Sequence, residues 1–127
     1  MGSGTLIFWV YYMAELTEFN IGQGETFRVA ATIISDSGSI PLNITDYTFT
    51  GQVRENYTTD EIAATFTITK LSPLNSGSII IELEPTQTVQ LNQRRYVYDI
   101  NMTSGSVTPI KRRILEGALT IRPAATR

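Results

Sequence analysis

Apolar and more polar residues alternate with a period of two along most of this chain. Phe27, Val29 and Ala31 illustrate the pattern, with Arg28 and Ala30 between them. Because successive side chains of a β-strand point to opposite faces, such alternation predicts strands that are buried on one face. Similar runs cover residues 41–44, 47–54, 62–70, 79–83, 95–103 and 110–122. No run keeps an apolar period of 3.6 residues, so we expect no helix longer than one turn over residues 86–91, after Pro85.

Turn-forming residues separate these runs. Gly, Pro, Asn, Asp and Ser cluster in residues 35–39, 73–77 and 104–106, where they favour tight turns. Short strands with regular turns and no long helix favour an all-β fold. We therefore predict an antiparallel, immunoglobulin-like β-sandwich of about seven strands, formed by residues 15–127 and preceded by an apolar N-terminal arm of residues 1–14. A small β-barrel is the structural alternative.

Two tyrosines lie on the apolar face of the run over residues 95–103. Tyr96 and Tyr98 alternate in phase with Ile100 and Met102. We expect both rings to pack in the core with their hydroxyls bound to the backbone, because a buried tyrosine hydroxyl usually finds a partner. The tyrosine corner of immunoglobulin domains is one version of this arrangement.

The N-terminal arm contains the longest apolar run of the chain, which covers residues 6–12. Seven residues are too few to span a bilayer, which needs roughly 20 in a helix, and no basic region precedes them as in an export signal. The run could form an extra strand on the protein's own sheet. It could instead pair with the sheet edge of a neighbouring subunit, or precede a natural start at Met13. On the second interpretation the partner-binding residues are Leu6, Phe8, Trp9, Val10, Tyr11 and Tyr12.

Charge is distributed unevenly along the chain. Residues 1–93 carry ten acidic and three basic side chains, a net charge of −7, and residues 94–127 carry two acidic and seven basic, a net charge of +5. These charges could simply be solvated, or they could match head to tail between copies. Arg94, Arg95, Arg112 and Arg113 are the candidate contacts. We expect no nucleic-acid partner, because Arg112 faces opposite its two basic neighbours in a strand and no stacking aromatic is interleaved with them.

The composition argues against enzymatic chemistry. The chain has no cysteine and no histidine, which excludes disulfides, thiolate metal sites and the usual nucleophile–histidine arrangements. The carboxylate pairs Asp60–Glu61 and Glu82–Glu84 are expected on solvated surfaces. We therefore expect no catalytic residues, no cofactor and no metal, and a net charge of −2 gives no attraction to anionic membranes.

Five phrases of the sequence point to a family. They are Gly24-Glu25-Thr26-Phe27-Arg28-Val29, Pro41-Leu42-Asn43-Ile44-Thr45-Asp46-Tyr47, Gln52-Val53-Arg54, Tyr96-Val97-Tyr98-Asp99-Ile100 and Arg113-Ile114-Leu115-Glu116-Gly117-Ala118-Leu119-Thr120-Ile121. In this order, over roughly residues 18–125, they resemble small bacteriophage virion proteins with an immunoglobulin-like domain, in particular the N-terminal domain of phage baseplate upper proteins. The resemblance implies a tail, baseplate or fibre-attachment connector, assembled in the bacterial host cytoplasm into the virion. It also implies many symmetric copies that bind other phage structural proteins and one another.

The chain departs from this family at its C-terminal end. Family members often continue into fibre or receptor-binding parts, whereas this sequence stops at Arg127. A stand-alone connector is therefore our first expectation, and a capsid decoration protein is the second. A carbohydrate-binding module for host recognition is an alternative of another class. Such modules usually expose aromatic side chains, and Trp9, the only tryptophan, lies in the arm.

Overall fold

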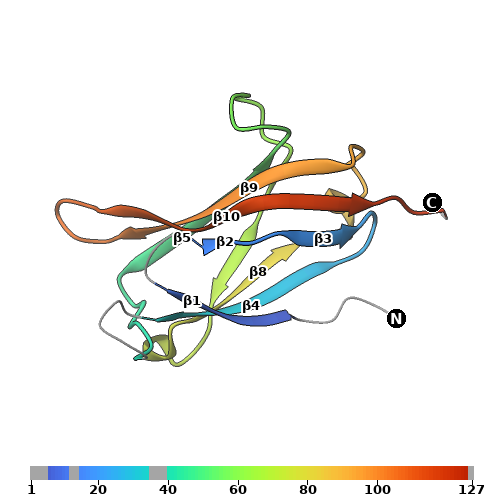
Figure 1. Cartoon of the computed structure of the whole chain (residues 1–127). Coiled ribbons are helices and arrows are strands. Elements are labelled where there is room, and N and C mark those ends of the chain that lie inside the picture. Colours follow the sequence, from blue (N-terminus) through green and yellow to red (C-terminus); the bar gives the residue numbers. More distant parts are fainter. Residues whose placement is uncertain (1–5, 12–14, 35–39, 126–127) are drawn as a thin grey trace.

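The computed structural model describes residues 6–11, 15–34 and 40–125, which form two β-sheets packed face to face (Figure 1). One sheet has the strand order β1 (Leu6–Tyr11), β4 (Phe27–Ile34), β8 (Ser78–Leu83) and β7 (Thr67–Lys70). The other has the order β2 (Glu15–Leu16), β10 (Lys111–Arg122), β9 (Arg95–Ser104), β5 (Tyr47–Arg54) and β6 (Ala64–Thr65), and β3 (Phe19–Gly22) also pairs with β10. The predicted all-β sandwich is confirmed. The described residues form ten strands rather than about seven, because β1, β2 and β3 precede the predicted strands and the run over residues 62–70 divides into β6 and β7. The expected strand over residues 41–44 is wrong, since Pro41 forms only an isolated bridge to Ile34.

Most neighbouring strands pair antiparallel, as predicted, but the N-terminal strands do not. β1 runs parallel to β4, and both β2 and β3 run parallel to β10. β4 follows β3 through a tight turn but lies in the other sheet. β3 therefore pairs with β10 instead of forming an antiparallel hairpin with β4.

The alternation of the sequence corresponds to burial. Along β9 the side chains of Tyr96, Tyr98, Ile100 and Met102 are all buried, while the residues between them are only partly covered. β10 is the exception, because its register against β9 shifts between Arg113 and Leu115. At such a bulge two residues of one strand oppose one of its partner.

Aromatic rings from both sheets fill the middle of the core. The ring centroids of Phe19 and Tyr98 lie 5.4 Å apart, and those of Phe66 and Tyr98 lie 6.0 Å apart. Phe27 packs edge-on to Phe19 at 5.3 Å. These tilted and edge-on arrangements are the ones that aromatic quadrupoles favour.

Both core tyrosines bind the backbone, which confirms the prediction made from their spacing. The Tyr96 hydroxyl accepts a hydrogen bond of 3.1 Å from the Gln93 backbone N–H, three residues upstream. This is the geometry of a tyrosine corner. The corner follows the predicted helical turn, α1 (Pro85–Thr88), which begins with a capping box between Glu84 and Gln87.

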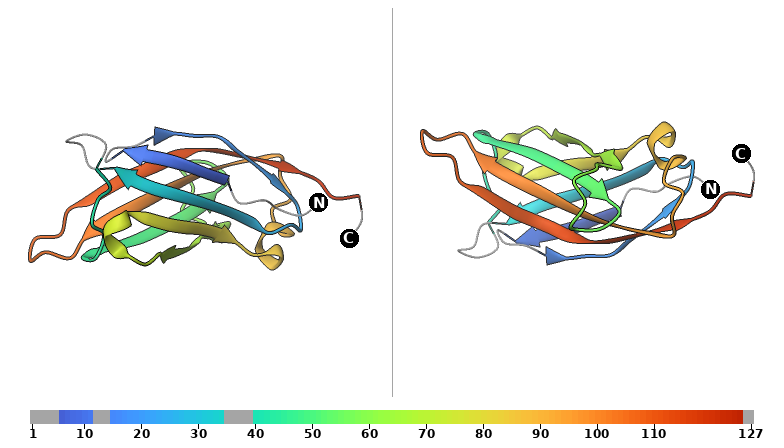
Figure 2. Two further views of the ribbon diagram at one scale, coloured as in Figure 1. Left: turned by 90° about the horizontal axis from the view of Figure 1, so that it is seen from below. Right: turned by 90° about the horizontal axis from the view of Figure 1, so that it is seen from above.

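The segment over residues 64–70 passes from one sheet to the other (Figure 2). Its first part, β6, pairs with β5, and the Phe66 N–H donates a hydrogen bond of 2.9 Å to the Gly51 carbonyl. Its second part, β7, pairs with β8 and leads to the short 3-10 helix Leu74–Ser76. The segment therefore bridges the two sheets at one side of the sandwich.

The register of β5 against β9 defines two ends of the molecule. Tyr47 lies opposite Ser104, where the β9–β10 hairpin turns, and Arg54 lies opposite Val97, where the β5–β6 loop begins. Seven residues of strand separate the two positions, which corresponds to about 24 Å. We call these the hairpin end (residues 103–112) and the loop end (residues 55–63 and 84–94). The hairpin extends from one end of the sandwich in Figure 1.

Candidate interaction surfaces

The structure places the apolar run of the N-terminal arm in its own sandwich. Leu6, Phe8, Trp9, Val10 and Tyr11 lie in β1, and the run pairs with β4 in the register Leu6 to Val29 through Tyr11 to Ile34. Tyr12 lies outside the described residues. β1 also approaches β10 of the other sheet. Of the interpretations open from the sequence, the structure shows the intramolecular strand, and contact of these residues with a partner stays a prediction.

The four candidate arginines form two separate pairs. Arg95 opens β9 and lies opposite Thr120, whereas Arg112 and Arg113 lie opposite Met102 and Asn101. Arg95 and Met102 are seven residues apart on one strand, about 24 Å. Arg94 therefore lies at the loop end with Arg95 next to it, and Arg112 lies at the hairpin end with Arg113 next to it.

Arg95 and Arg113 are paired with carboxylates of the same chain. Arg113 lies 3.1 Å from Glu116 and 3.7 Å from Asp99, and Arg95 lies 3.7 Å from Glu18. Exposed pairs of this kind stabilise a fold only weakly. They do reduce the charge that these arginines offer to a partner, so the uneven charge of the sequence is partly cancelled in the fold.

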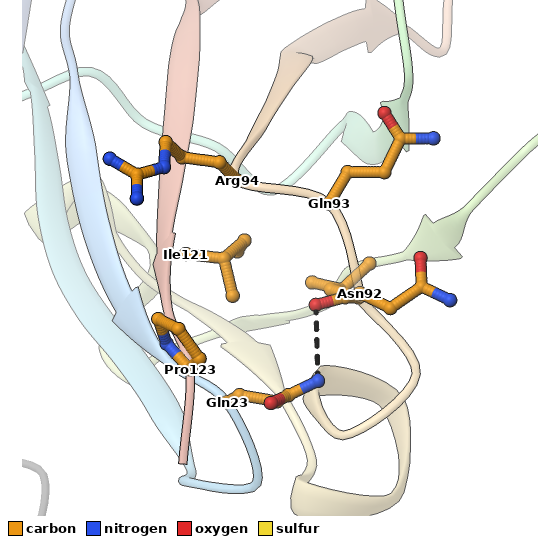
Figure 3. Close-up of a pocket in the computed structure, with 7 residues that line it drawn as sticks. Gln23, Asn92, Gln93, Arg94, Ile121 and Pro123 are labelled. Atoms are coloured by element: carbon orange, nitrogen blue, oxygen red, sulfur yellow. Dashed lines mark hydrogen bonds between the residues drawn. The ribbon is translucent and has the colours of Figure 1, made fainter. Parts of the chain in front are cut away.

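Arg94 borders a small groove of about 190 Å³ at the loop end (Figure 3). Ile121 and Pro123 form one wall, and the side chains of Arg94 and Gln93 extend in opposite directions from its rim. The Gln23 amide crosses the groove, where it donates hydrogen bonds to the carbonyls of Val89 (3.2 Å) and Leu91 (3.5 Å). Because Gln23 is committed to these bonds, we interpret the groove as a packed junction between loops.

The hairpin end presents apolar side chains next to basic ones. Val107 at the turn is fully exposed and Ile110 is 55% exposed. Lys111 and Arg112 follow directly and are exposed as well. Apolar residues in a turn are uncommon, and this feature, which the strand pattern does not reveal, could have been found by searching the predicted turns for them.

Hydrogen bonds fix the shape of this turn. The Ser104 N–H donates to the Ile110 carbonyl at 3.0 Å, and the Ile110 N–H donates to the Ser104 hydroxyl at 2.9 Å. The Ser106 hydroxyl donates to the Thr108 carbonyl at 2.8 Å. Val107 is therefore held at the apex of an ordered turn.

The loop end has an acidic groove of about 170 Å³. Its lining residues come from the β5–β6 loop, from the segment between α1 and β9, and from the start of β9. They include Glu55, Glu61, Ile62, Gln90, Asn92 and Tyr96. Ile62 is 44% exposed, and Val89, which precedes the lining residue Gln90 in the sequence, is 46% exposed. Among the described residues, Glu55 and Glu61 form no ion pair. The predicted solvation of Asp60 and Glu61 is confirmed, since both are exposed.

Local hydrogen bonds also order the β5–β6 loop. The Asn56 carboxamide oxygen accepts hydrogen bonds from the N–H groups of Thr58 (3.0 Å) and Thr59 (2.9 Å). Arg54 donates to the Thr59 carbonyl at 3.1 Å and to the Gln52 side chain at 2.8 Å. The groove is therefore shaped by the loop itself.

Tyr57 is an exposed aromatic residue that the sequence analysis missed. It is 61% exposed and lies over the outer face of the six-stranded sheet, beside Gln52, Arg54 and Asp99. Partial burial, together with the negative charges of Glu116 and Asp99, raises the pKa of its hydroxyl. A single aromatic residue inside the polar stretch of residues 55–61 is the signal that could have identified it.

Within the described part of the chain, no group of three or more acidic residues is arranged to hold a metal ion. The helices among the described residues are also too short and too polar to cross a bilayer.

No protein-family model and no curated protein sequence matches the chain. Among solved structures it is similar to the N-terminal domain of phage TP901-1 ORF48, with a TM-score of 0.60 and 7% identity, over 93% of this chain and 98% of that one. The chain shares its fold with a phage protein domain. It is less similar to the cysteine protease inhibitor EhICP2 from Entamoeba histolytica, with a TM-score of 0.45 and 16% identity, over 93% of this chain and 97% of that one. That second TM-score is too low to support an inference.

The resemblance to a phage protein is therefore confirmed at the level of the fold alone. The likeness extends over nearly the whole ORF48 domain, so it includes both sheets.

Proposed function

We propose that this chain is a non-enzymatic structural component of a bacteriophage particle, a tail or baseplate connector that acts through protein–protein contacts. The observation that carries the proposal is the likeness of the whole fold to the N-terminal domain of phage TP901-1 ORF48. The ordered sequence phrases that resemble phage virion domains support it from the sequence. A chain of this kind is assembled in the bacterial host cytoplasm into the virion, in several symmetric copies.

The surface chemistry fits binding better than catalysis. Cysteine and histidine are absent from the sequence, which removes the side chains most used for nucleophilic and general-base chemistry near neutral pH. The exposed features are instead apolar and charged groups at the two ends of the sandwich. Such groups serve contacts with other proteins of the particle.

Purified particles of the phage that encodes this chain provide the test. We expect mass spectrometry to detect the chain in particles banded by density gradient, and electron microscopy to locate it at the tail or baseplate. Disruption of its gene should yield particles that lack the structures distal to it, and a plasmid copy should restore them. Particles that lack the chain, together with an unchanged titre after disruption, would contradict the proposal. If the chain is located on the capsid instead, it is a decoration protein and not a connector.

A second candidate function is carbohydrate binding, which Tyr57 favours. Sugars are commonly bound by an exposed aromatic ring with planar polar side chains around it, and Gln52, Arg54 and Asp99 surround Tyr57. This function predicts that the purified chain binds members of a bacterial glycan array and that Tyr57→Ala abolishes the binding. Thr50→Ala, also on the outer face of the sheet, is the matched control. Absence of binding by the wild-type chain would exclude this candidate.

A further inference from the structure

Exposed apolar residues lie beside basic side chains at the hairpin end and beside acidic side chains at the loop end. Val107 and Ile110 lie close in sequence to Lys111 and Arg112 at the hairpin end, while Ile62 lines the same groove as Glu55 and Glu61 at the loop end. An exposed apolar residue is unremarkable alone. Apolar residues matched by complementary charges on a second surface are typical of an interface, where the charges align the partners.

Both surfaces are ordered before any partner arrives. The hairpin turn is fixed by the bonds of Ser104 and Ser106, and the loop by those of Asn56 and Arg54. Ordering of flexible groups is one of the main costs of association, so pre-formed surfaces bind more tightly than flexible ones.

We propose that the hairpin end of one copy docks in the acidic groove at the loop end of the next copy. Val107 enters the groove beside Ile62, and Lys111 lies against Glu61. A second copy of this chain is the occupant, because a basic protrusion and an acidic groove occur together on one chain at opposite ends of β5. A contact between two different surfaces of identical subunits is heterologous, and it generates a ring or a filament. This inference rests on the proposed function, whose multi-copy assembly it describes.

Charge reversal tests the docking. Lys111→Glu and Glu61→Lys should each weaken self-association of the full chain about fivefold or more, since each places like charges in contact. An equimolar mixture of the two variants should associate again, because each hairpin then meets a groove of opposite charge. Val107→Asp should weaken association about tenfold or more, and Thr50→Glu, a charge added on the outer sheet face, should not change it. Sedimentation velocity over a concentration series measures these effects, and thermal melting verifies the fold of each variant.

Three results would overturn the docking. They are a wild-type chain that stays monomeric at millimolar concentration, single variants that associate like the wild type, and a mixture that fails to associate. In all three cases the proposed function stands or falls separately, on whether the chain is found in purified particles.

Discussion

The Tyr98 hydroxyl donates a hydrogen bond of 2.7 Å to the backbone carbonyl of Thr17, which lies 81 residues earlier in the chain. Thr17 connects β2 to β3, and its N–H donates to the Glu116 carbonyl of β10 at 2.9 Å. The bond therefore fastens the N-terminal strands to the centre of the six-stranded sheet from inside the core.

Tyr98→Phe should lower the free energy of unfolding by about 1 kcal/mol, because it removes one hydrogen bond and leaves the Thr17 carbonyl without this donor. Urea denaturation measures the change. Tyr57→Phe removes a hydroxyl that is exposed and should leave stability unchanged, which makes it the matched control. Equal effects of the two substitutions would show that the Thr17 bond contributes nothing.

Alkaline pH should destabilise the fold through Tyr98. Burial, followed by the nearby Tyr57 and Glu116, raises the pKa of the Tyr98 hydroxyl above its ordinary value. In the unfolded chain this hydroxyl ionises near pH 10, so above that pH the unfolded state loses the proton first and is favoured. The stabilisation by the Tyr98 hydroxyl is complete below about pH 10. It is lost as the pH rises toward the higher pKa of this hydroxyl in the folded state, by up to about 1.4 kcal/mol per pH unit. Urea denaturation between pH 8 and pH 11 should therefore show a smaller loss for Tyr98→Phe than for the wild type.

Gly117→Ala should destabilise the protein by about 2 kcal/mol or more. Gly117 has a φ of 154°, and a Cβ atom there would overlap the Thr17 carbonyl oxygen. Relief requires the N-terminal strands to move away from β10, and overpacking of this kind typically costs 1–3 kcal/mol in addition to backbone strain. Gly24→Ala is the control, because Gly24 also has a positive φ, of 81°, but no atom lies within 4 Å of its Cβ position. Comparable losses at the two glycines would contradict the crowding at Thr17.

Removal of residues 1–12 should lower the melting temperature of the sandwich. The deletion takes away β1 and leaves the β4 edge that pairs with it without a partner. An unpaired strand edge is also prone to pair with other chains, so we expect the truncated chain to aggregate at lower concentration. Deletion of residues 1–5 alone retains β1 and is the control. An unchanged melting temperature after the longer deletion would show that β1 does not stabilise its own sheet. It would favour the alternative that residues 6–12 bind a neighbouring subunit.

The sequence predicted the strands and their buried faces well, because alternation reports burial directly. It identified the faces of β4, β5, β8 and β9, the helical turn after Pro85, and the backbone bonds of Tyr96 and Tyr98. Partner and direction were harder, since alternation reports which face of a strand is buried but not which strand lies beside it. For this reason the sequence analysis missed the parallel pairing of β1 with β4 and of β3 with β10. It also missed the change of sheet at Phe66.

The candidate surfaces were predicted less well than the fold. Arg95 and Arg112 both belong to the basic C-terminal part of the sequence, but the strand register places them about 24 Å apart. Ion pairs with Glu18, Asp99 and Glu116 also reduce the charge that Arg95 and Arg113 present to a partner. Tyr57 and Val107 lie in loops, where no periodic pattern exists to distinguish a binding residue from an ordinary loop residue.

The passage of residues 64–70 from one layer to the other restricts how copies can combine. Only two residues of this segment pair with β5 and four pair with β8, so neither layer has a long straight border on that side. Lateral stacking into continuous ribbons, as in amyloid, needs such a border. Edge-to-edge pairing with another chain is therefore disfavoured on this side of the sandwich, because neither layer offers a long unpaired strand there.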